Sequence, residues 1–110
     1  KLADGTANPY LMMGGLIAAG MDGVSTQVLL PEPILVSPAT LESGAREVLG
    51  IAALPFSLPA ACDLLERDTA LSAALGTPLL DAYLAVKRQE ARSFEGLTAT
   101  VEQIRHFWKF

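Results

Sequence analysis

"ADGTANPYLMMGGLIAAGMDG", residues 3–23, sets a polar turn in front of an apolar run that carries no charge until Asp22. Asn8 is a good N-cap residue, and Pro9 suits the first helical position because its missing N–H would have no partner there anyway. We therefore predict a helix from Pro9 to about Met21, ended by Asp22 and Gly23. This helix has no polar face, so we expect neighbouring elements to cover it on all sides.

Residues 24–57 connect this helix to the second half of the chain. Four prolines punctuate the stretch, at Pro31, Pro33, Pro38 and Pro55. Proline removes a backbone donor and fixes φ, which excludes a central strand or a long helix here. We predict an extended connection with one short helix over residues 38–49.

Residues 57–76 show two helix signatures in succession. Ser57 is the expected cap of the first, with an ion pair between Asp63 and Arg67 one turn apart. Asp68 is the expected cap of the second, which Gly76 closes.

Two further helices complete the chain. Thr77 before Pro78 predicts the start of a long helix, and Thr100 with Gln103 has the spacing of a capping box. The segment 1–110 is thus expected to be mainly α, with about four to five helices and a proline-rich connection.

The composition points to covered surface rather than to a nucleic-acid or membrane partner. Hydrophobic residues make up 51% of the chain and charged residues 18%, below the roughly 25% of typical soluble domains. The net charge of −4 gives no basic footprint for nucleic acid. The first apolar run is shorter than the roughly 20 residues that cross a bilayer. We expect another subunit or further chain to cover part of this surface.

Few side chains could carry chemistry. His106 is the only histidine, and Asp4, Asp22 and Glu32 are the carboxylates outside the amphipathic helices. The sequence contains no P-loop or nucleophile elbow, and one histidine with one cysteine is too few for a transition-metal site. We predict no catalytic residue and no metal ligand within this segment. The single cysteine, Cys62, is expected to be a buried inert thiol of a cytoplasmic protein.

Four ordered blocks resemble the glutamine synthetase family. "ADGTANPYLMMGGLIAAGMDGV" (residues 3–24) is similar to the block after the catalytic sheet, where a D-x-x-ANPY-apolar-AGLDG pattern recurs. "LPEP" (30–33), "LPFSLPAACDLLERD" (54–68) and "LLDAYLAVKRQE" (79–90) follow in the family's order. The apolar connection is closer to the glutamine-synthetase-like branch that includes γ-glutamyl-amine ligases.

The resemblance implies the C-terminal helical part of an α+β catalytic domain. Family members ligate ammonia, or a larger amine, to glutamate through a γ-glutamyl phosphate, with ATP and Mg or Mn. These cofactors are expected in the full-length parent and not on this segment, which alone should be inactive. The partners so implied are the upstream part of the same enzyme and further copies in a ring-shaped homo-oligomer.

The resemblance also assigns one residue of this segment to the substrate. The family's E-x-R arginine, which contacts glutamate and the transferring phosphate, falls on Lys1. Lysine keeps the positive charge but lacks the planar fork that grips an oxyanion with two bonds. Some bacterial members carry a modifiable tyrosine after the first helix, whereas Tyr10 and Tyr83 both lie outside residues 24–57.

A second reading remains open at this point. The segment could be a non-catalytic helical packing or oligomerisation module from a glutamine-synthetase-like protein that has lost activity, as the change to Lys1 allows. The amine acceptor is also open, because its pocket is formed elsewhere.

Overall fold

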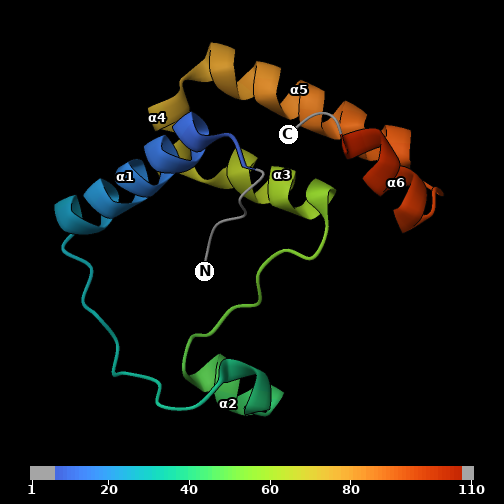
Figure 1. The fold of residues 1–110 in the computed structure, drawn as a ribbon. Helices are drawn as coiled ribbons and strands as arrows, with labels where there is room; N and C mark the ends of the chain where they lie inside the picture. The colour runs from blue at the N-terminus through green and yellow to red at the C-terminus, as the bar shows by residue number, and fades with distance from the viewer. Residues whose placement is uncertain (1–6, 108–110) are drawn as a thin grey trace.

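The computed structural model describes residues 7–107, in which helices alternate with irregular connections and no strand occurs (Figure 1). The elements are α1 (Pro9–Ser25), the 3₁₀ turn η1 (Pro38–Thr40), α2 (Ser43–Val48), α3 (Leu58–Arg67), α4 (Thr69–Leu75), α5 (Thr77–Phe94) and α6 (Ala99–His106). The prediction of a mainly α segment with a proline-rich connection is confirmed. Six α-helices form in the described part, against the four to five expected.

The helices pack in a chain of neighbours rather than around one centre. Helices α3, α4 and α5 contact one another, and α1 packs on α4 (Figure 1). Among the described residues only Cys62 on α3 and Leu84 on α5 are buried, with 2% and 4% of their surface exposed. The burial expected for Cys62 is confirmed. Helices α3 and α5 therefore enclose almost all of the water-free interior.

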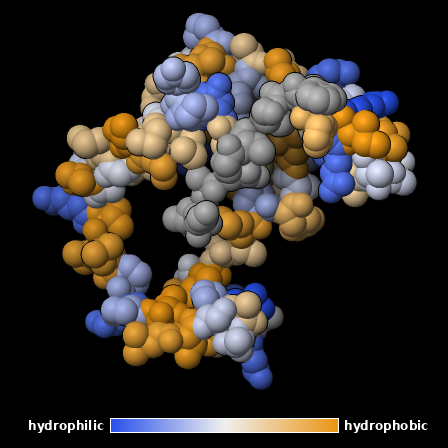
Figure 2. Space-filling model, in the orientation of Figure 1, coloured by the Kyte–Doolittle hydropathy of each residue, from blue (hydrophilic) through white to orange (hydrophobic). Residues whose placement is uncertain are grey.

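Much apolar surface is left uncovered by this chain. The accessible surface is 9211 Å², whereas a compact monomer of 11.6 kDa would expose about 5,800 Å². The radius of gyration is 16.6 Å, against about 13 Å for a compact domain of this length. Figure 2 shows apolar surface along the connection after α1 and over α2, and Leu29, Leu30 and Leu35 are each more than 90% exposed.

Three predicted caps are confirmed. The Asn8 side-chain oxygen accepts hydrogen bonds from the N–H groups of Tyr10 and Leu11 at 3.0 and 3.2 Å. Ser57 Oγ accepts from the N–H of Ala60 at 3.3 Å, and Asp68 Oδ1 accepts from that of Leu71 at 2.8 Å. The first turns of α1, α3 and α4 are thus set by local side-chain contacts.

The predicted starts of the last two helices are wrong. Gly76, with φ of +72°, is the N-cap of α5, so Thr77 is already helical and makes no capping bond. Thr98 is the N-cap of α6, two residues before the expected Thr100. Gly76 both ends α4 and caps α5, and its positive φ sets the turn between the two helices one residue before the expected cap.

Helix α1 ends later than predicted, and none of its residues is buried by the described part of the chain, contrary to the coverage expected on all sides. It continues through Gly23 to Ser25, and Gln27 then adopts a left-handed φ of +53°. The N–H of Val28 donates to the carbonyl of Gly23 at 3.0 Å, and that of Gln27 donates to Val24 at 3.2 Å. This pair of bonds is a Schellman motif, with Gln27 where glycine is usual.

Replacing this glutamine should stabilise the protein. A left-handed conformation costs a non-glycine residue about 1–2 kcal/mol, and part of that gain is lost to the greater freedom of glycine in the unfolded chain. We expect Gln27→Gly to raise the free energy of unfolding by about 0.5–1 kcal/mol, as measured by urea denaturation.

The neighbouring Thr26 provides the control. It is right-handed, with φ of −87°, and its Oγ1 donates to the Asp22 carbonyl at 2.7 Å. Thr26→Gly should lower the free energy of unfolding. Destabilisation by both variants would contradict the strain assigned to Gln27.

Candidate functional site

Charged side chains converge at one place in the described structure, between α3 and α5. Asp63 and Glu66, one turn apart on α3, both accept hydrogen bonds from Arg88 on α5. Arg88 Nη1 lies 3.1 Å from Glu66 Oε1, and Nη2 lies 2.7 Å from Glu66 Oε2 and 3.1 Å from Asp63 Oδ1. The guanidinium fork therefore grips Glu66 with two bonds and Asp63 with one.

This arrangement corrects the ion pair expected within α3. Asp63 was predicted to pair with Arg67, but its carboxylate bonds to Arg88, 25 residues away in the sequence. The contact between α3 and α5 presents a guanidinium that can bind both acidic residues at once. Arg67 makes no ion pair among those found at residues 7–107.

The Arg88 cluster shifts two proton equilibria. The hydrogen bond from Arg88, followed by its charge, lowers the pKa of the Glu66 carboxyl below its ordinary 4.5. Hydrogen bonds to Glu66 and Asp63 raise the pKa of Arg88 further. Both shifts stabilise the ionised forms of Glu66 and Arg88. Neither group therefore exchanges a proton near neutral pH, as a general acid or base would, and we call the cluster a structural clamp.

Lys87 forms a second ion pair on α5. Its Nζ donates to Glu90 Oε2 at 2.8 Å, and this hydrogen bond raises the pKa of the Lys87 ammonium. The amine therefore stays protonated and is no candidate for a nucleophile or Schiff base, which would require a lowered pKa.

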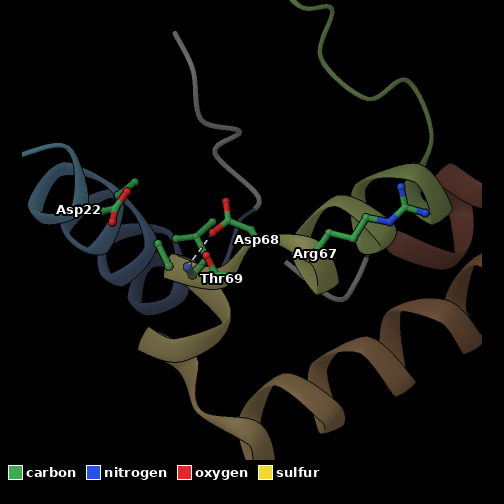
Figure 3. Close-up of a pocket in the computed structure, with 7 residues that line it drawn as sticks. Asp22, Arg67, Asp68 and Thr69 are labelled. Carbon is green, nitrogen blue, oxygen red and sulfur yellow. Dashed lines mark hydrogen bonds between the residues drawn. The ribbon is translucent and has the colours of Figure 1, made fainter. Parts of the chain in front are cut away.

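A shallow pocket of about 370 Å³ lies between α1 and the α3–α4 junction (Figure 3). Asp22 and Asp68 line it, but Asp68 already caps α4 through the N–H of Leu71. Figure 3 shows Arg67 extending away from both carboxylates. The pocket thus lacks a set of polar groups directed at one point, which a catalytic site requires.

The candidate residues of the sequence are scattered. Asp22 lies at this pocket, and Glu32 is exposed on the connection. His106 ends α6, and its side chain lies outside the described part, as do Lys1 and Asp4 altogether. Within residues 7–107 no three His, Cys, Asp or Glu side chains are grouped closely enough to hold a metal ion.

The sequence was compared with protein-family models. The model described as "Glutamine synthetase, catalytic domain" matches residues 1–106. The chain belongs to the glutamine synthetase family. The resemblance carried by the four sequence blocks is thereby confirmed.

Several curated relatives cover most or all of this glutamine synthetase segment. The gamma-glutamylpolyamine synthetase GlnA3 of Streptomyces coelicolor is 39% identical over 110 residues, which is the whole chain and 24% of that protein. A glutamine synthetase of Methanocaldococcus jannaschii is 37% identical over 94 residues, covering 86% of the chain and 21% of that protein. The gamma-glutamylethanolamide synthetase GlnA4 of S. coelicolor is 32% identical over 107 residues, covering 97% of the chain and 21% of that protein. The chain thus spans about a quarter of the length of these relatives, or less.

Membrane-spanning potential was tested on the described residues. No one helix among them combines the length and apolarity needed to cross a bilayer. Helices α4 and α5 meet the criteria of length and composition only when taken together, and they are bent by 106° at the break between them.

The Arg88 clamp should make stability depend on acid pH. A carboxyl whose pKa is lowered on folding stabilises the protein above its unfolded value, and that contribution is lost as the pH falls through the folded value. We expect Arg88→Met to lower the thermal midpoint at pH 7, and the difference from the unsubstituted protein to shrink below about pH 4.5, the ordinary pKa of glutamate.

Arg67→Met is the matched control, since it removes the same charge from a residue outside the clamp. Its effect on the thermal midpoint should be smaller, and the effect of Arg88→Met should diminish with added salt. Equal effects of the two variants at pH 7 would contradict the clamp.

Proposed function

We propose that this chain is the C-terminal helical part of an ATP-dependent ligase that joins an amine nitrogen to the γ-carboxylate of glutamate. The observation that carries the proposal is the 39% identity to the gamma-glutamylpolyamine synthetase, which extends over every residue of this chain. A glutamine synthetase and a gamma-glutamylethanolamide synthetase match the same region. The nitrogen donor is therefore ammonia or a larger amine.

The proposed reaction has two steps. The γ-carboxylate of glutamate attacks the terminal phosphate of ATP, which gives γ-glutamyl phosphate and ADP. The amine nitrogen then attacks the acyl carbon, phosphate leaves and a proton is released. Phosphoryl transfer of this kind requires cationic groups around the phosphate oxygens, which divalent metal ions and basic side chains supply.

This segment contributes support rather than the metal site. Residues 7–107 hold no group of carboxylates suited to Mg or Mn, so in our proposal the metal ligands lie elsewhere in the polypeptide. The isolated 110 residues should be inactive, and their uncovered apolar surface suits packing within a larger cytoplasmic enzyme that forms a homo-oligomer.

Lys1 is the residue of this segment that we assign to the substrate. It stands at the family's arginine position and lies seven residues before the Asn8 cap of α1. An ammonium there would neutralise negative charge on the transferring phosphate as a point charge, without the two-bond grip of arginine.

The experiment that tests the proposal is an assay of the full-length polypeptide that contains this chain. Phosphate release from ATP should require both glutamate and a nitrogen donor, tested with ammonia, ethanolamine and a polyamine in parallel. Release that occurs without glutamate would contradict the proposed ligase reaction, and no release with any donor would favour the non-catalytic helical module.

Substitution of Lys1 tests its assigned contact. Removing one charged group that stabilises a transferring phosphate lowers rates by about 100-fold or more, so Lys1→Met should lower kcat/KM for glutamate by about that factor. Lys1→Arg should retain most of the activity, because it restores the charge and adds the fork. Equal activity of Lys1→Met and the unsubstituted enzyme would remove Lys1 from the site.

A further inference from the structure

We draw no further inference here: the strongest candidate, the apolar surface patch on the connection between α1 and α2, where Leu29, Leu30 and Leu35 are each more than 90% exposed, carries nothing because nothing in the structure shows what covers it.

Discussion

The contact between α3 and α5 is the interaction on which the rest of this segment depends. It includes the two buried residues of the described part, Cys62 and Leu84, and it is clamped at its edge by Arg88. Helix α4 links the two helices and carries α1 on its other side. Among residues 7–107, no side chain outside this contact is fully buried.

So small an interior cannot offset the conformational entropy of ordering a hundred residues. Proteins gain that free energy mainly by burying apolar surface, and here the apolar residues of α1 and of the connection are exposed. In our proposal the remaining stabilisation comes from surfaces of a longer polypeptide. The chain belongs to the glutamine synthetase family and spans about a quarter of its relatives' length, which supports that proposal.

Local signals were enough to predict most of the helices and three caps, because a cap such as Asn8 acts within its own first turn. The partner of Asp63 could not be predicted in this way, since Arg88 is brought to it only by the packing of α5 on α3. The start of α5 depended on the positive φ of Gly76, a property of the turn and not of Thr77. For the site, the sequence pointed to Lys1 only through the family pattern, and the described residues do not include it.

The glycines of α1 connect these observations. In a free-standing helix Gly14, Gly15 and Gly20 would each lower helix stability. Within residues 7–107, nothing lies within 4 Å of the position that a Cβ on any of them would occupy. Close approach of another backbone is a common reason for glycine inside a helix. The same helix has no charged residue between Pro9 and Met21, so its exposed surface is unfavourable in water and favourable in an interface. Helix α1 thus has the composition of an interior element, although in this segment it lies at the surface.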